Sequence, residues 1–243
     1  MKPKDQALEV WGELACFSEI KAERFSYPVI TPSAARGVYD AIYCKPSEFR
    51  WQITRIEVLR WWDDEATAPK YIALRRNEVA KKAPAPRTIA RWMTGKADPQ
   101  PIWADDTEHA VRVQRQTMAL KNVRYRLHAY IRPWPGFEDK IEAIEAQFRR
   151  RAERGQCIYQ PYLGCREFPA YFRLVEPNEQ PEPDQRMPWS ADLGFMLYDV
   201  FDLSRPGTSD SPWHISIFRA KVENGVLDVP EYDSDLVLKP QGG

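Results

Sequence analysis

A residue whose type and position could do chemistry is Tyr43, a phenol placed two residues before Lys45 where an expected helix gives way to an expected strand. A phenolic hydroxyl beside cationic side chains suits work on a phosphate backbone, because cations attract phosphate and the hydroxyl can orient a reacting group. The simpler interpretation is that Tyr43 is a core aromatic and that Pro46 ends the helix. Both interpretations are open from these residues alone.

Histidine and cysteine give little support for metal chemistry. Zinc ligands usually come in close pairs. No CxxC pair occurs among the cysteines, and no HExxH spacing occurs among the histidines: Cys16, Cys44, Cys157, Cys165, His109, His128 and His214. We therefore predict free thiols, no metal site and no cofactor.

Charge is balanced overall but segregated along the chain. The formal net charge is zero, from 35 Lys and Arg against 35 Asp and Glu, which argues against a uniformly basic coat protein for nucleic acid. Basic residues gather in segments 73–92 and 147–156, and acids gather elsewhere. Segregated charge on a neutral protein is typical of a polyanion-binding surface. A solvated face remains the alternative for each run.

Composition predicts a globular, cytoplasmic protein. At 243 residues, with 43% hydrophobic residues, the chain can form one large domain or a main domain with a smaller companion. No segment approaches the roughly 18 apolar residues of a membrane span. The first 17 residues lack the hydrophobic region of a secretory signal.

Helices are expected at 32–43, opened by the N-cap Thr31 with Pro32 at its first position, and at 137–155, where acids precede arginines and Gly155 closes the helix. Strands are expected at 8–17, 48–62, 71–79 and 163–177, with a hairpin at 109–133 that turns near 121–122. Without the central insertion the order is strand, helix, strand, strand, helix, strand. This order predicts an α+β fold, a ferredoxin-like (RRM-like) βαββαβ domain.

The predicted domains follow from this order. Residues 1–175 form the ferredoxin-like domain, with a basic insertion at about 63–108. The proline-rich, acidic segment 176–190 is a linker, and 191–243 form a small antiparallel β domain with a hairpin turn at Asn224-Gly225.

Three longer stretches carry a family resemblance. The segments "FSYPVITPSAARGVYDAIYCKP", "VRYRLHAYI" and "RRRAERGQCIYQPYLGCREFPAYF" resemble the Cas-five-d (subtype I-C) family of CRISPR-associated proteins, within the RAMP superfamily. The resemblance implies a protein that binds the repeats of CRISPR precursor RNA and cleaves them without metal. The 2′-hydroxyl would attack, leaving a cyclic phosphate and a 5′-hydroxyl. The protein would then stay on the 5′ handle of the guide in the type I-C surveillance complex. The implied partners are repeat RNA and other subunits of that complex. Duplex DNA is a further possible partner that follows from the basic segments and not from the resemblance, and no membrane is expected.

The resemblance also implies an active site. The family groups a tyrosine at the end of the first helix with an adjacent Lys-His pair at the start of the second, and Tyr43 falls on the tyrosine position. The pair falls on Ala143 and Ile144, which cannot do acid-base chemistry. Lys140, one helical turn earlier, is the nearest replacement for the lysine. His128 could replace the histidine if its side chain faces the site.

Arginines and lysines of the two basic segments are the predicted RNA-binding residues, because phosphate contacts supply affinity. They are Arg75, Arg76, Lys81, Lys82, Arg87, Arg91, Arg149, Arg150, Arg151 and, in the loop before the last strand of the domain, Arg166. Trp92 offers a face on which an unpaired base could stack, or else a buried core position.

Two other functions compete with a repeat-RNA endoribonuclease. A subunit that holds the guide handle without cutting is favoured by the missing Lys-His pair. A general duplex-binding protein without sequence preference would also explain the basic segments.

Overall fold

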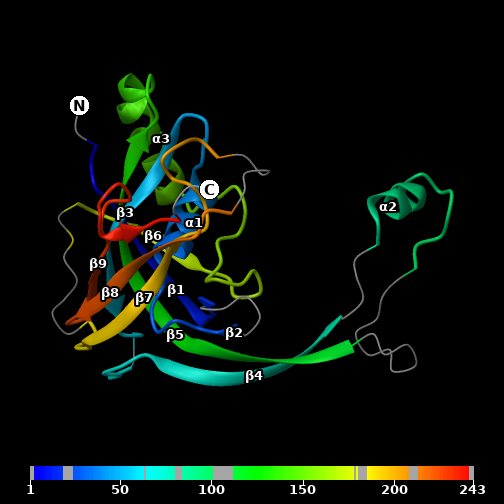
Figure 1. Cartoon of the computed structure of the whole chain (residues 1–243), viewed down its shortest axis with the longest axis horizontal. Helices are drawn as coiled ribbons and strands as arrows, with labels where there is room; N and C mark the ends of the chain where they lie inside the picture. The colour runs from blue at the N-terminus through cyan, green and yellow to red at the C-terminus, as the bar shows by residue number, and fades with distance from the viewer. Residues whose placement is uncertain are drawn as a thin grey trace. The chain divides into compact units, whose positions relative to one another are not determined.

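The chain forms a mixed α/β structure with a large antiparallel sheet and few helices (Figure 1). The computed structural model describes residues 3–18, 24–62, 64–79, 84–100, 112–177, 179, 185–207 and 213–240, with no side chains described at 76–79 and 112–113. One compact unit comprises Met1–Ile72 with Met118–Gly243, and a second comprises Ala73–Thr117. The second unit begins and ends about ten residues later than the insertion expected at 63–108.

The elements of the larger unit follow one another as β1 (Gln6–Ala15), β2 (Arg24–Phe25), α1 (Pro32–Ile42), β3 (Phe49–Leu59), η1 (Glu138–Lys140), α3 (Ile141–Glu153), β6 (Tyr171–Val175), β7 (Ala191–Asp199), β8 (Ser216–Glu223), β9 (Val226–Asp228) and β10 (Val237–Leu238). The long strands β4 (Lys70–Val79) and β5 (Arg112–Pro133) enter the smaller unit, which also holds α2 (Pro86–Met93). The expected helices and most expected strands are therefore confirmed.

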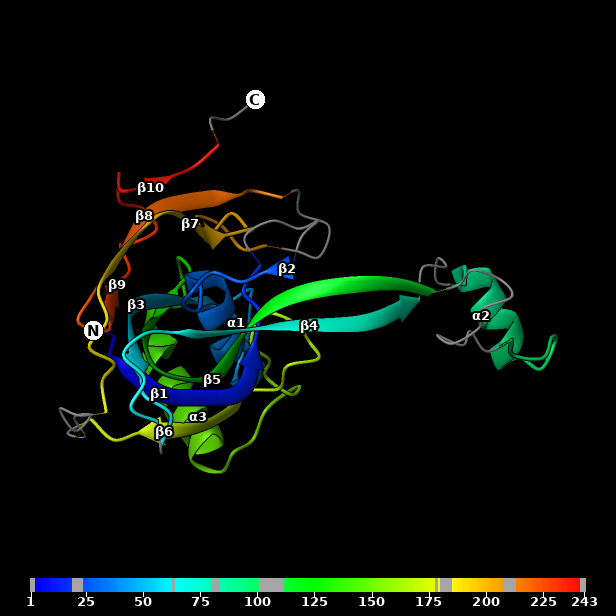
Figure 2. The ribbon, with the colours of Figure 1, turned by 90° about the horizontal axis from the view of Figure 1, so that it is seen from below.

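Among the described residues, the main path of the sheet has the order β10-β8-β9-β3-β5-β1-β6, and its named pairs are antiparallel. β7 joins β8, and Figure 2 shows β8 between β7 and β10. The C-terminal strands continue this sheet, because β9 pairs with β3 from Arg55↔Asp228 to Glu57↔Val226. Residues 176–190 therefore separate the C-terminal strands from the earlier strands in the sequence, although both groups belong to one hydrogen-bonded sheet.

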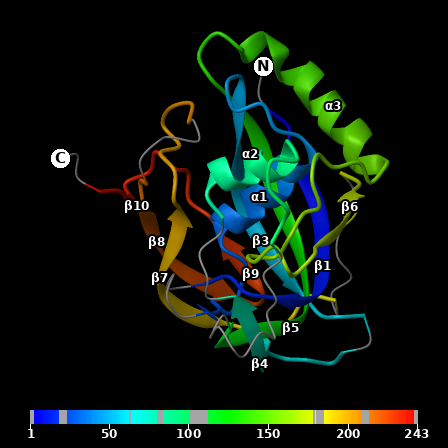
Figure 3. The same cartoon turned by 90° about the vertical axis from the view of Figure 1, so that its right-hand side faces the viewer.

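Two helices cover one face of the central strands. Thr31 caps α1 by accepting a hydrogen bond from the Ala34 N–H, as its position before Pro32 predicts. Tyr39 of α1, Trp51 of β3 and Phe148 of α3 stack with ring centroids 4.6–5.6 Å apart. Figure 3 shows α3 alongside β6. These buried aromatics fix α1 and α3 against the same face of the sheet.

The opposite face of the sheet carries polar side chains. Because Trp51 pairs with Ile131 and side chains alternate along a strand, Leu127 and Ile131 face the helices, while Arg126 and His128 face away from them. The C-terminal part of the chain packs on this polar face: the Gln52 amide donates to the Tyr198 hydroxyl at 2.8 Å, and the Tyr130 hydroxyl donates to Glu231 at 2.8 Å. Two buried carboxylates on this face are paired with arginines: Glu9 with Arg124, and Glu57 with Arg186.

The expected hairpin turn near 121–122 is wrong. Residues Arg112–Pro133 form one continuous strand, and Asn122 adopts φ +53° within it. Asn tolerates this left-handed conformation better than most residues, which is why it is typical of turns. Here Asn122 lies two residues before Arg124, which pairs with Leu59 at the end of β3. The strand β5 also pairs with β4.

Candidate active site

Tyr43 ends α1 and is fixed by its backbone. Its N–H donates to the Tyr39 carbonyl at 2.9 Å, and its own φ of −152° takes the chain out of the helix. Its carbonyl accepts a hydrogen bond from Trp51 Nε1 at 3.0 Å. The half-buried ring packs on Phe49, with centroids 5.8 Å apart. The backbone and the ring make these contacts, so they hold the Tyr43 side chain in place without its hydroxyl group.

The turn that follows Tyr43 is held by the end of β5. Trp134 Nε1 donates to the Pro46 carbonyl at 2.7 Å, and the Trp134 N–H donates to the Glu48 carbonyl at 2.9 Å. Within the turn, the Glu48 N–H donates to the Lys45 carbonyl at 2.9 Å. The tight turn therefore presents Lys45 and Glu48 beside the end of α1.

Two ammonium groups meet at the Glu48 carboxylate. Lys45 Nζ lies 3.3 Å from both Glu48 oxygens, and Lys140 Nζ lies 4.0 Å from Glu48 Oε1. The pKa of Lys45 is raised by its hydrogen bond to Glu48 and also by the Tyr43 phenol. Lys140 belongs to the short 3₁₀ turn before α3, and its ammonium lies 4.7 Å from the Phe137 ring centroid.

These contacts bring Tyr43 and Lys140, both predicted from the sequence, to one place, with Lys45 and Glu48 between them. We call these four residues the corner cluster. It offers a phenol to orient a hydroxyl and two cations to neutralise phosphate charge. The sequence interpretation noted Lys45 but did not include it in the site, and it missed Glu48. The signal was present, because acidic Glu48 follows basic Lys45 by three residues within a proline-containing turn.

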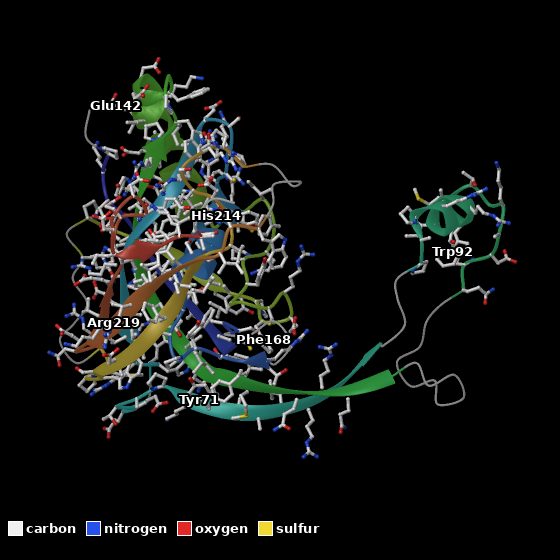
Figure 4. All side chains as sticks on the ribbon, viewed as in Figure 1. Tyr71, Trp92, Glu142, Phe168, His214 and Arg219 are labelled. Carbon is white, nitrogen blue, oxygen red and sulfur yellow. The ribbon has the colours of Figure 1, made fainter. Side chains whose placement is uncertain are left out.

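The positions of the family Lys-His pair contribute no such groups. Ile144 is buried in the core under α3, and Ala143 is exposed one position earlier. Glu142, in the first turn of the same helix, is also exposed (Figure 4). The chain thus presents no imidazole on the first turn of α3.

His128 does not join the corner cluster, which corrects the expectation that it could. It lies on the polar face of β5, opposite the helices, with Nδ1 2.9 Å from Asp5 Oδ2 and Nε2 2.9 Å from Glu57 Oε1. Burial opposes its charge, but these two carboxylates outweigh burial and raise the pKa of His128. Glu57 also binds Arg186 at 2.8 Å, and its pKa falls to about 2 because hydrogen bonds from His128 and the Arg186 charge outweigh its burial.

Three arginines at the end of α3 have different surroundings. Arg151 Nε donates to the Ile42 carbonyl at 2.6 Å, so it caps α1 next to Tyr43. Arg149 pairs with Glu176 at 3.2 Å, and Arg150 donates to the Gln147 amide oxygen at 2.8 Å. Arg166 is exposed in the loop before β6. Arg149, Arg150 and Arg166 are therefore accessible to a ligand, whereas Arg151 already stabilises the fold.

The remaining predicted RNA-binding residues belong to the smaller unit or lie outside the described residues. Arg75 on β4 and Arg87 and Arg91 on α2 are exposed. Only the backbone of Arg76 is described, and Lys81 and Lys82 lie outside the described residues. Trp92 is half-buried on α2, a helix with no fully buried residue (Figure 4).

Within the described parts of the chain, no three His, Cys, Asp or Glu side chains are grouped to hold a metal ion. The four cysteines are free thiols. Among the same residues, no helix is both long and apolar enough to span a membrane.

Comparisons with known proteins agree with one another. A family model, Cas_Cas5d, described as CRISPR-associated protein (Cas_Cas5), matches residues 7–230. A protein of Mannheimia succiniciproducens named CRISPR pre-crRNA endoribonuclease Cas5d is 37% identical over 240 residues, covering 96% of this chain and 97% of the relative. A protein of the same name from Thermus thermophilus is 38% identical over 237 residues, covering 92% of this chain and 90% of the relative.

Two solved structures have a similar fold. A crystal structure of a CRISPR-associated protein matches with a TM-score of 0.59 at 19% identity, covering 98% of each chain. A functionally uncharacterized protein from Streptococcus mutans matches with a TM-score of 0.57 at 19% identity, covering 97% of each chain. At this identity the likeness concerns the fold alone.

Proposed function

The chain belongs to the Cas5d family of CRISPR-associated proteins, and we propose from this that it is an endoribonuclease that processes CRISPR precursor RNA. Its substrate is the repeat segment of that RNA. After cleavage it stays on the 5′ handle of the guide within the type I-C surveillance complex.

The observation that carries a catalytic role is the corner cluster. A phenol at the end of α1 and two ammonium groups meet around Glu48, at a surface where Lys45 and Lys140 are about half exposed. Metal-free RNA cleavage needs a group to orient the 2′-hydroxyl, a cation for the charge on phosphorus and a donor for the leaving oxygen. The Tyr43 phenol matches the first need, and the Lys45 and Lys140 ammonium groups match the other two.

The reaction we propose exchanges one P–O bond for another and moves two protons. The 2′-oxygen bonds to the adjacent phosphorus as its hydroxyl proton passes to solvent water, the bond from phosphorus to the 5′-oxygen breaks, and that oxygen takes up a proton, so that the products are a 2′,3′-cyclic phosphate and a 5′-hydroxyl. Tyr43 orients the 2′-hydroxyl by hydrogen bonding, which its phenol can do without taking up a proton. Lys45 and Lys140 neutralise the phosphate, and one of them supplies the proton to the leaving oxygen.

The finer fold assignment is also a proposal. The strands β3, β5, β1 and β6 lie in that order, with α1 and α3 on one face. This order supports a ferredoxin-like domain carrying the insertion as a side unit, with strands β7–β10 added at one edge. The other subunits, duplex DNA as a ligand and a cytoplasmic location remain predictions.

A test of the function uses the purified protein and the repeat RNA in excess EDTA. We expect one cut per repeat, with a 5′-hydroxyl on the 3′ fragment. Tight binding without a cut would instead identify a guide-handle subunit that does not cleave. Equal competition by unrelated duplexes at matched salt would identify a general duplex-binding protein.

A further inference from the structure

The helix that carries Tyr43 ends without the usual glycine cap. Many helices end at a left-handed glycine, which allows the N–H groups beyond it to bond to the last carbonyls of the helix. In α1 the C-cap is Tyr43 itself, which is extended at φ −152°, and the last turn of α1 contains no basic residue. The last carbonyls of α1 therefore need hydrogen-bond donors from other parts of the chain.

Two of these donors come from the end of α3 and from the loop that follows it. Arg151 Nε donates to the Ile42 carbonyl at 2.6 Å. The Ile158 N–H donates to the Ala41 carbonyl, also at 2.6 Å. Because the two acceptors belong to the two residues before Tyr43, the end of α3 holds the backbone that carries the phenol.

The backbone at the end of α3 satisfies its own carbonyls. Gly155 adopts φ +62°, and its N–H donates to the Ala152 carbonyl at 3.1 Å. The Gln156 N–H donates to the Arg151 carbonyl at 2.9 Å. These two bonds form a Schellman motif, which closes a helix with backbone groups alone. The side chain of Arg151 is therefore not needed to cap its own helix and can serve α1.

The last turn of a helix is sensitive to a lost hydrogen bond, because helix ends fray. Removing the donor to Ile42 would loosen the residue next to Tyr43, while the Tyr43 ring would keep its contact with Phe49. The expected result is a small displacement of the phenol and not an unfolded helix. A displacement of about 1 Å at a group that orients a reacting atom can cost about 10²-fold in rate.

We propose that Arg151 is a positioning residue for Tyr43. By donating to the Ile42 carbonyl, it fixes the last turn of α1 so that the phenol meets the 2′-hydroxyl of the RNA. The inference rests on the proposed function, because it takes Tyr43 as the group that orients this hydroxyl. It gives Arg151 a role that needs no contact with the RNA, unlike the phosphate contact expected from the sequence.

Three variants separate the hydrogen bond of Arg151 from its charge. Arg151→Met keeps an aliphatic side chain but removes the donor. Arg151→Gln places an amide nitrogen at the same distance along the side chain as Nε, so it keeps a donor for the Ile42 carbonyl without the charge. Arg154→Met is the matched control, because it removes the same charge from the exposed C-cap residue of α3.

The first readout is single-turnover cleavage of repeat RNA at saturating protein. We expect Arg151→Met to cleave about 10- to 100-fold more slowly than the wild type, and Arg151→Gln to stay within about threefold of it. The RNA affinity of Arg151→Met should change no more than that of Arg154→Met. In a Tyr43→Phe background, Arg151→Met should slow the residual cleavage by less than about threefold, because the group that Arg151 positions no longer has its hydroxyl.

Three results would overturn the inference. The first is an Arg151→Met protein that cleaves as fast as Arg154→Met. The second is an Arg151→Gln protein as slow as Arg151→Met, which would mean that the charge acts and not the hydrogen bond. The third is an effect of Arg151→Met that stays undiminished in the Tyr43→Phe background. If Arg151→Met does not fold, Arg151→Gln decides alone, since a loss of more than about tenfold in its cleavage rate would contradict the inference.

The second readout is the position of the Tyr43 ring, measured by NMR on protein with ¹³C-labelled tyrosine. The signal that disappears in Tyr43→Phe identifies the ring. This signal should shift in Arg151→Met and stay in place in Arg151→Gln and Arg154→Met. A wild-type protein that binds repeat RNA without cutting it would remove the proposed function, and the ring signal would then decide the inference separately. An unmoved signal in Arg151→Met would show that Arg151 does not position Tyr43.

Discussion

Replacing His128 by alanine should destabilise the protein while leaving its chemistry intact. The imidazole makes two hydrogen bonds of 2.9 Å, to Glu57, which is 3% exposed, and to Asp5, which is 55% exposed. A hydrogen bond to a charged, buried group contributes about 1.5–3 kcal/mol, whereas an exposed pair contributes less than about 1 kcal/mol. Because Arg186 still pairs with Glu57, we expect the variant to lose about 2–3 kcal/mol of unfolding free energy. This corresponds to a fall in Tm of about 4–12 °C.

The loss of unfolding free energy in His128→Ala should depend on pH in a defined direction. The pKa of His128 is raised above 6.5, so its contribution is complete below pH 6.5 and is lost as pH rises through the folded-state pKa. The pKa of Glu57 is lowered from 4.5 to about 2, so its contribution is complete above pH 4.5 and is lost as pH falls toward 2. The difference in unfolding free energy between the wild type and His128→Ala should therefore be largest between about pH 5 and 6 and should shrink at alkaline pH.

The assay pairs denaturant unfolding at several pH values with single-turnover RNA cleavage under conditions where both proteins are folded. Asp5→Ala is the control, since it removes the exposed partner and should cost less than about 1 kcal/mol. Cleavage by the folded His128→Ala protein should stay within about threefold of wild type. A fall of more than about 100-fold in cleavage with unchanged stability would refute the reasoning and return His128 to the mechanism.

Three further predictions concern the site. Tyr43→Phe keeps the ring on Phe49 and both backbone hydrogen bonds, so single-turnover cleavage should fall about 10²- to 10⁴-fold with RNA affinity nearly unchanged; undiminished cutting would remove Tyr43 from the mechanism. Lys45→Ala should slow cleavage more than Lys140→Ala, because Lys45 lies two residues from Tyr43 and its ammonium is 3.3 Å from both Glu48 oxygens, whereas that of Lys140 is 4.0 Å away; the reverse order in the same assay would assign the main cation to Lys140. Arg149→Ala combined with Arg150→Ala should weaken binding and reduce the slope of log affinity against log salt by about one to two, whereas an unaltered slope would mean that both arginines are only solvated.

The sequence predicted the helices and turns whose ends are marked by capping or turn residues. Thr31 before Pro32 predicts the start of α1, and Gly155, which adopts φ +62°, predicts the end of α3. The turn at Asn224-Gly225 is likewise confirmed between β8 and β9, where both residues have positive φ. The same chemistry misled the prediction at Asn122, because a left-handed asparagine can lie inside a strand as well as in a turn. Only the pairing of β5 with β1, β3 and β4 distinguishes the two cases.

The part of the candidate site formed by residues close together in the sequence could be predicted, whereas the part formed by distant segments could not. Tyr43 and Lys45 are two residues apart, and their helix-to-strand corner was visible in the sequence. The distance from Lys140 to Glu48 depends on the 3₁₀ turn before α3 and on Trp134, which holds the turn after Tyr43. His128 was different, because the alternation of polar and apolar residues along β5 could have assigned it to the face with Arg126, a signal that the sequence interpretation did not use.

The corner cluster also explains how phosphate could bind where a carboxylate already sits. Glu48 contacts both ammonium groups, but Lys45 and Lys140 are 46% and 48% exposed, so solvent screens each pair and each contributes little to stability. A phosphate that accepts charge-assisted hydrogen bonds from both lysines gains more than these exposed pairs lose. Glu48 thus directs both ammonium groups at one point. The Lys-His pair that the family would use on α3 is replaced by Ala143 and Ile144 in this chain, so we expect the two lysines that contact Glu48 to supply the positive charge for the phosphate.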